Sequence, residues 1–108
     1  MSYDDPIDEL LGGMRKSVRS LNGRLDNEAG QVGQNFTMID LMSQGYKVKD
    51  VSNDHSKHYD IHAVRGNEEL HIENKAGWRS ELTPAERARQ ARDPKYRVKR
   101  TPRFMPRL

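Results

Sequence analysis

Apolar and polar residues alternate over the segment from Lys57 to Ala76, and this alternation predicts a β-hairpin. Residues 59–64 and 70–75 form two alternating runs of the length that strands usually have. Between them lies RGNE, whose Gly66-Asn67 pair is typical of tight reversals. We therefore expect two antiparallel strands joined at this pair.

The position of the loop fixes which residues of the hairpin face each other. On one face it sets two apolar pairs, Ile61 with Ile72 and Ala63 with Leu70. On the other face it sets two polar pairs, Asp60 with Glu73 and His62 with His71. Because a slip of one residue would mix the two faces, the apolar pairing itself favours this register.

Apolar residues at three- and four-residue spacing predict helices before the hairpin. A first helix is expected after Asp5 and Pro6, followed by a break over residues 22–27 and a second helix from Glu28 to Gln44 that Gly45 ends. The apolar stripe of the first is Ile7, Leu10, Leu11, Met14, Val18, Leu21 and Leu25, and the apolar side of the second is Val32, Phe36, Ile39 and Leu41 or Met42. We expect the first stripe to cover the core, with a homodimer seam as the alternative.

Strands and one further helix complete the predicted order of elements. Residues 46–51 predict a short strand before the hairpin, and residues 96–99 predict a last strand. Between hairpin and last strand, Thr83-Pro84-Ala85-Glu86 combines the features of a helix start, and the helix is expected to run to about Arg92. Trp78 is expected to pack, with base stacking as the alternative.

Length and composition indicate one small α/β domain. The chain has 108 residues, 33% of them apolar, which allows only a thin core. It has no cysteine, so disulfides and thiolate zinc sites are excluded. No apolar run reaches membrane-spanning length and the acidic N-terminus is not a secretion signal, so we expect no membrane partner and a cytoplasmic site of action. The expected parts are an N-terminal helical extension (1–24), a core (25–100) and a basic tail (101–108).

The net charge of +3 is unevenly distributed along the chain. Residues 95–108 contain six lysines or arginines and no acid. Such a block is typical of a chain that binds a polyanion, so nucleic acid is the expected partner. The residues expected to contact it are Arg87, Lys95, Arg97, Lys99, Arg100, Arg103 and Arg107.

The polar face of the hairpin carries a pattern suited to phosphodiester chemistry. Opposed Asp60 and Glu73 would lie roughly 4.5–5.5 Å apart at Cβ, where two carboxylates repel each other unless a cation lies between them. Mg²⁺ or Mn²⁺ is the expected ion, because it binds carboxylate oxygens and leaves positions for water and phosphate. Lys75 follows on the same face, where an ammonium would position the attacking water and stabilise the transition state.

At these residues the sequence resembles the PD-(D/E)xK, or restriction-endonuclease-like, nuclease superfamily. Asp60 matches the first acidic position, and Glu73, Asn74 and Lys75 match the E-x-K. The resemblance covers about residues 28–100. It implies a core made of a helix, a three-stranded antiparallel meander, a helix and a further strand, here with an extra N-terminal helix. It also implies a Mg²⁺-dependent endonuclease that ligates the metal through Asp60 and Glu73. As its substrate we favour DNA over RNA, and both remain candidates.

The resemblance also implies an acidic residue on the helix before the first strand, eleven positions before the Gly-aromatic pair. That position holds Gln34, and Glu28 lies six residues earlier. Spacing favours Gln34 as the residue that completes the site, and chemistry favours Glu28. Both remain candidates.

Three alternative functions fit parts of the pattern. The first is a secreted or delivered toxin nuclease that acts on transfer RNA or DNA of a rival cell and has an inhibitor protein as a partner. The second is a nucleic-acid-binding module without catalysis. The third is a hydrolase centred on zinc, in which His62 and His71 would bind a transition metal with Asp60.

Overall fold

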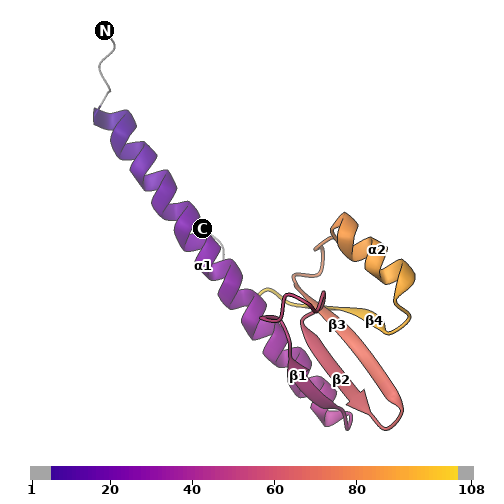
Figure 1. The fold of residues 1–108 in the computed structure, drawn as a ribbon. Coiled ribbons are helices and arrows are strands. Elements are labelled where there is room, and N and C mark those ends of the chain that lie inside the picture. The colour runs from indigo at the N-terminus through magenta and orange to yellow at the C-terminus, as the bar shows by residue number, and fades with distance from the viewer. Residues whose placement is uncertain (1–5, 105–108) are drawn as a thin grey trace.

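The structure is a computed structural model that describes residues 6–104. Its elements in chain order are α1 (Pro6–Ser43), β1 (Lys47–Asp50), β2 (Ile61–Arg65), β3 (Glu68–Ala76), α2 (Pro84–Arg92) and β4 (Tyr96–Thr101). The strands lie in the order β1-β2-β3-β4, with the first three antiparallel and β4 parallel to β3. The described residues thus form a small α/β domain with two helices and a mixed sheet, which Figure 1 shows between α1 and α2.

The predicted hairpin is confirmed, and its register is confirmed from Ile61 onward, whereas the expected pair of Asp60 with Glu73 is not part of the ladder. Ile61 pairs with Ile72, and Ala63 pairs with Leu70, as the apolar pattern requires. Gly66 has a φ of +58°, a left-handed conformation that glycine adopts without steric cost, and this allows the tight reversal.

The predicted break over residues 22–27 is wrong, because α1 is one continuous helix. The boundary expected between residues 24 and 25 therefore falls inside this helix. Asn22 and Gly23 are poor helix formers, but each costs only about 1 kcal/mol or less, and the segment contains no proline. Asn22 is buried and Leu25 is half-buried, so packing holds the helix where its local propensity is weakest.

The face that α1 turns toward the sheet consists mostly of small and polar residues, with Leu41 as its large apolar residue. Ala29, Gln34, Thr37 and Leu41 are buried there, and Thr37 Oγ1 donates to Asn74 Oδ1 at 2.5 Å. Gly33 allows this close approach, since a Cβ at this position would collide with the side-chain oxygen of Thr101. A bulky apolar stripe cannot fit between elements packed this closely.

Several apolar residues expected to be buried are therefore exposed, which corrects the predicted stripes. In the C-terminal half of α1, only Leu41 of the expected side is fully buried, whereas Phe36, Ile39 and Met42 are exposed. In the N-terminal half, Leu10, Leu11, Met14 and Val18 are exposed, because this part of α1 extends beyond the sheet (Figure 1). The expectation that the first stripe covers the core is wrong for these four residues. Asp5 and the side chain of Ile7 lie outside the described part of the chain.

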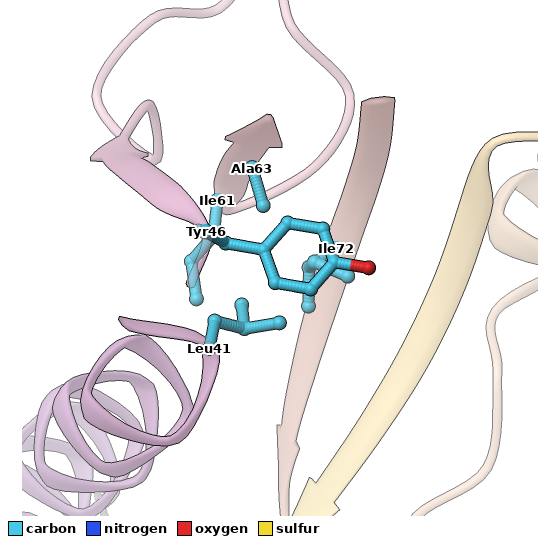
Figure 2. Packing of buried hydrophobic residues seen from close by; sticks show 5 residues of the cluster. All are labelled: Leu41, Tyr46, Ile61, Ala63 and Ile72. Atoms are coloured by element: carbon cyan, nitrogen blue, oxygen red, sulfur yellow. The ribbon is translucent and has the colours of Figure 1, made fainter. Parts of the chain in front are cut away.

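The main core lies between α1 and the sheet. Leu41 of α1 meets Ile61, Ala63 and Ile72 of the hairpin, and Tyr46 closes the cluster from the loop after the helix (Figure 2). A second cluster on the opposite face contains Val51, Tyr59 and Tyr96, with Val98 packed against it. The two clusters pack on opposite faces of the sheet, and Glu73 and Lys75 of β3 share the face of the second cluster.

Capping interactions end α1 and start α2 as predicted. At Gly45, φ is +90°, and Tyr46 N–H donates to Leu41 O at 3.0 Å, which closes the last turn of α1. Thr83 and Glu86 form a capping box, with Pro84 in the first turn and Asp93 as the C-cap of α2.

The segment after β4 returns to α1. The Phe104 ring stacks on Phe36 with centroids 4.8 Å apart, and Arg103 forms an ion pair with Asp26 at 2.7 Å. Trp78, in contrast, is 67% exposed, so the expectation that it packs is wrong.

Candidate functional site

Four charged side chains gather on the face of the sheet that α2 covers. Asp60 precedes β2, Glu73 and Lys75 alternate with buried Ile72 along β3, and Glu86 lies in the first turn of α2. Alternation along β3 places Glu73 and Lys75 on the face opposite to Ile72, as predicted. Asp60, Glu73 and Lys75 thus come together, and Glu86 joins them from the crossover helix.

Asp60 departs from the regular ladder by one residue. Its N–H donates to Ile72 O at 2.8 Å, whereas its carboxylate Oδ2 accepts from Asn74 N–H at 2.9 Å. The regular pairing begins only at Ile61. The backbone of β3 therefore holds Asp60 on both sides of Glu73, its main chain at Ile72 and its carboxylate at Asn74, and this places the carboxylate beside the Glu73 side chain.

The carboxyls of Asp60 and Glu73 strongly affect each other's ionisation. Burial raises the pKa of Glu73 to about 8, and the neighbouring charges of Asp60 and Glu86 add to the increase. Burial also raises the pKa of Asp60, while the hydrogen bonds from Asn74 N–H and the Glu73 carboxyl oppose this rise. A half-buried site with three crowded acids and one ammonium favours an additional cation.

Lys75 and Glu86 form the ion pair of the site, with Nζ and Oε1 2.6 Å apart. The same Oε1 accepts from Thr83 N–H at 2.8 Å, so the cap holds the carboxylate in place. Although burial opposes ionisation, the hydrogen bonds from Lys75 and Thr83 lower the pKa of Glu86 to about 2. Sequence reasoning used Glu86 only as a capping residue and missed it as a member of the site.

Basic side chains line the cleft next to these acids. The cleft has a volume of about 330 Å³ and is lined by His58, Glu73, Ala85, Glu86, Arg89 and Arg92. In the sequence, Arg92 marked only the end of the predicted helix, and the position of Arg89 and Arg92 beside Glu73 was not predicted. The helical spacing of Glu86 and Arg89 is the signal that puts them on one side of α2.

Gln34 and Glu28 do not join this cluster. Gln34 is buried against the opposite face of the sheet, where it helps to lower the pKa of Asp50, after the larger contributions of the Ser52 hydrogen bonds. Glu28 is exposed on α1.

The residues expected to bind nucleic acid are spread over several surfaces. Arg100 aligns with Lys75 and so shares its face, whereas Lys99 aligns with Asn74 on the α1 side. Lys95 pairs with Glu69 at 3.0 Å, and Arg97 donates to Pro94 O at 2.7 Å. Arg87 is exposed, Arg103 pairs with Asp26, and Arg107 lies outside the described residues.

The two hairpin histidines meet as predicted, with a different acid as their neighbour. His62 pairs with His71 across the strands, and both contact Glu69. Within residues 6–104, these three form the group whose ligand atoms all lie within 4.8 Å of one another. Asp60, expected to accompany the histidines, lies instead with Glu73.

Fold and site together define a small α/β domain with a half-buried carboxylate cluster beside a lysine. No model of a known family, no curated protein and no solved structure matches the chain. In the part of the chain that the structure describes, neither helix has the long apolar run needed to cross a membrane.

Proposed function

We propose that this chain is a nuclease that hydrolyses phosphodiester bonds with a divalent metal ion, and that DNA is its preferred substrate. The observation that carries the proposal is the meeting of the Asp60 and Glu73 carboxyls with the Lys75 ammonium alongside. The order of helix, three strands, helix and strand is the order that the resemblance to the PD-(D/E)xK superfamily implies.

The donor set fits a hard divalent cation. Asp60 and Glu73 offer carboxylate oxygens, and Mg²⁺ needs only one or two such ligands beside waters and a substrate phosphate. Burial raises the pKa of Glu73, and the negative charges of Asp60 and Glu86 raise it further, so a bound cation would offset the repulsion between these acids. When bound, Mg²⁺ or Mn²⁺ polarises a phosphate oxygen and lowers the pKa of water.

The protein's own side chains would then orient the reaction. Water attacks phosphorus, one P–O ester bond breaks, and negative charge develops on the phosphate oxygens. Lys75, held at 2.6 Å by Glu86, would position the water and stabilise this charge. Arg89 and Arg92 line the same cleft and would contact the neighbouring phosphates of the strand.

Cleavage by the full-length chain is the direct test. Plasmid DNA, single-stranded DNA and transfer RNA would each be incubated with Mg²⁺, with Mn²⁺ and with a chelator. We expect metal-dependent cleavage, and we expect Glu73→Gln and Lys75→Met each to reduce it by about 100-fold or more. Glu81→Gln, an exposed acid from the loop before α2, is the matched control and should cleave normally.

Two results would contradict the proposal. One is full activity of both Glu73→Gln and Lys75→Met, which would show that the cleavage does not use this cluster. The other is tight binding of nucleic acid with no cleavage under any metal condition, which would support the non-catalytic binding module. Cleavage confined to transfer RNA would keep the chemistry and overturn only the preference for DNA.

A further inference from the structure

We propose that His62, Glu69 and His71 form a second metal site, which binds a divalent transition ion with Zn²⁺ favoured. The inference goes beyond the proposed nuclease activity and rests on different residues. His62 on β2 and His71 on β3 face each other across the hairpin, and Glu69 lies two residues before His71 on the same face. One carboxylate oxygen, Glu69 Oε1, lies 3.1 Å from His62 Nε2 and 3.0 Å from His71 Nε2.

The spacing of these atoms is close to that of a tetrahedral zinc site. With metal–ligand bonds of about 2.0–2.1 Å, neighbouring ligand atoms in such a site lie about 3.3–3.4 Å apart. The two N···O distances in the structure are 3.0 and 3.1 Å, so each histidine nitrogen needs to move away from Glu69 Oε1 by only a few tenths of an ångström, and all three ligand atoms lie within 4.8 Å of one another. Two imidazoles and one carboxylate leave the fourth position for water, as in catalytic zinc sites.

The surroundings of His71 prepare it to act as a ligand. Asp93 Oδ2 lies 2.7 Å from His71 Nδ1 and accepts the Nδ1 proton, so a metal ion at Nε2 would displace only the proton that Nε2 shares with Glu69 Oε1. Asp93 is itself held by Arg89 Nε at 3.2 Å. The Tyr59 ring stacks on the His71 ring with centroids 4.3 Å apart, and this fixes the plane of the imidazole.

Glu69 is fixed in the same way and remains accessible. Lys95 Nζ binds its other oxygen, Oε2, at 3.0 Å and leaves Oε1 directed at the two histidines. The side chain of His71 is 14% exposed and that of Glu69 is 37% exposed, so an ion can enter from solvent. The nitrogen ligands distinguish this site from the all-oxygen cluster of Asp60 and Glu73, because Mg²⁺ prefers oxygen and Zn²⁺ binds imidazole.

Metal binding by the untagged full chain tests the inference without any activity measurement. Titration with Zn²⁺ in a calorimeter should give a single ion per chain, and Co²⁺ should give the visible absorption of a tetrahedral site. We expect His62→Ala and Glu69→Gln to abolish this binding. Asp93→Asn should weaken it by about 10–100-fold, the usual effect of removing the acid that orients a histidine ligand.

Two controls separate this site from the rest of the molecule. His55→Ala removes an exposed histidine of the loop before β2 and should bind Zn²⁺ normally. Glu73→Gln disables the proposed nuclease cluster and should also bind Zn²⁺ normally. Thermal unfolding of each variant without metal shows whether the variant is folded. If His62→Ala does not fold, His62→Gln is used in its place.

Three outcomes would overturn the inference: no Zn²⁺ binding by the unmodified protein, equal binding by folded His62→Ala or His62→Gln, and loss of binding in Glu73→Gln alone. The last result would place the ion at the Asp60 and Glu73 cluster. The proposed nuclease activity would stand in all three cases, because it is tested separately by cleavage with Mg²⁺.

Discussion

Lys75 and Glu86 form an ion pair 2.6 Å long that joins β3 to the first turn of α2. The carboxylate of Glu86 therefore has two roles, since it also accepts from Thr83 N–H and caps the helix. Glu86 also raises the pKa of Glu73, after burial and the charge of Asp60. The start of α2 is thus coupled electrostatically to the carboxyls of the candidate site.

Glu86→Gln should lower the pKa of Glu73. Glutamine keeps the capping box but removes the negative charge beside Glu73, so ionisation of Glu73 becomes easier. We expect the Glu73 pKa to fall from about 8 by about one pH unit or more, measured by NMR titration of the side-chain carboxyls. Glu81→Gln should leave it unchanged, and an unchanged value in Glu86→Gln would contradict the coupling.

The stability of the metal-free protein should reach a maximum near about pH 5. The pKa of Glu73 rises from an ordinary 4.5 to about 8 in the folded state, so the unfolded chain ionises first and stability falls as pH rises through this range. The pKa values of Glu69 and Glu86 fall to about 2, so stability also falls as pH drops below about 4.5. Urea unfolding in a chelating buffer measures both slopes.

Glu73→Gln isolates the alkaline part of this profile. Glutamine cannot ionise, so the variant should gain about 1–3 kcal/mol relative to the unmodified protein between pH 5 and 8. The loss of stability below about pH 4.5, which comes from Glu69 and Glu86, should remain in the variant. If the stability of the variant and of the unmodified protein changes with pH in the same way above pH 5, Glu73 is already ionised in the folded state, and the raised pKa is contradicted.

Gly33→Ala should destabilise the fold, whereas Gly30→Ala should stabilise it. An added Cβ at Gly33 collides with Thr101, while one at Gly30 meets nothing within 4 Å. Overpacking costs about 1–3 kcal/mol and the helix propensity of alanine returns about 1 kcal/mol, so we expect a net loss of up to about 2 kcal/mol at Gly33. At Gly30 only the gain applies. Equal effects on chemical denaturation at both positions would contradict the close packing of α1 on β4.

Deleting residues 1–18 should leave the domain folded. The residues of α1 from Glu9 to Val18 are exposed, except Gly12, which is half-buried. They therefore contribute little to the core. We expect the free energy of unfolding to change by less than about 1 kcal/mol. Deleting residues 1–30 is the contrasting variant, and it should be markedly destabilised because it removes buried Asn22 and Ala29.

Local chemistry made the hairpin and the helix ends predictable. The register followed from alternation and the Gly66-Asn67 loop, and the start of α2 followed from Thr83 and Glu86. The continuity of α1 did not follow, because the small helix costs of Asn22 and Gly23 are overcome by packing that no local pattern shows. Its buried face was missed for a related reason, since contact with Thr101 selects a small residue at Gly33.

The candidate site was predictable only where its residues share the hairpin. Glu73 and Lys75 could be placed on one face by alternation along β3, and Asp60 was expected beside Glu73, where it lies although it falls just outside the regular ladder. Glu86, Arg89 and Arg92 could not, because their place depends on how the crossover helix folds back over β3. Gln34 was selected by spacing along the chain, and α1 places it on the other side of the sheet.

The strand order has a consequence for how the protein behaves at high concentration. β1 and β4 are the outer strands, and their unpaired backbone groups could add strands from other molecules. Both carry closely spaced cations, Lys47 and Lys49 on β1 and Arg97, Lys99 and Arg100 on β4. Docking a second copy edge to edge would bring these like charges together, so the sheet resists growth into fibrils.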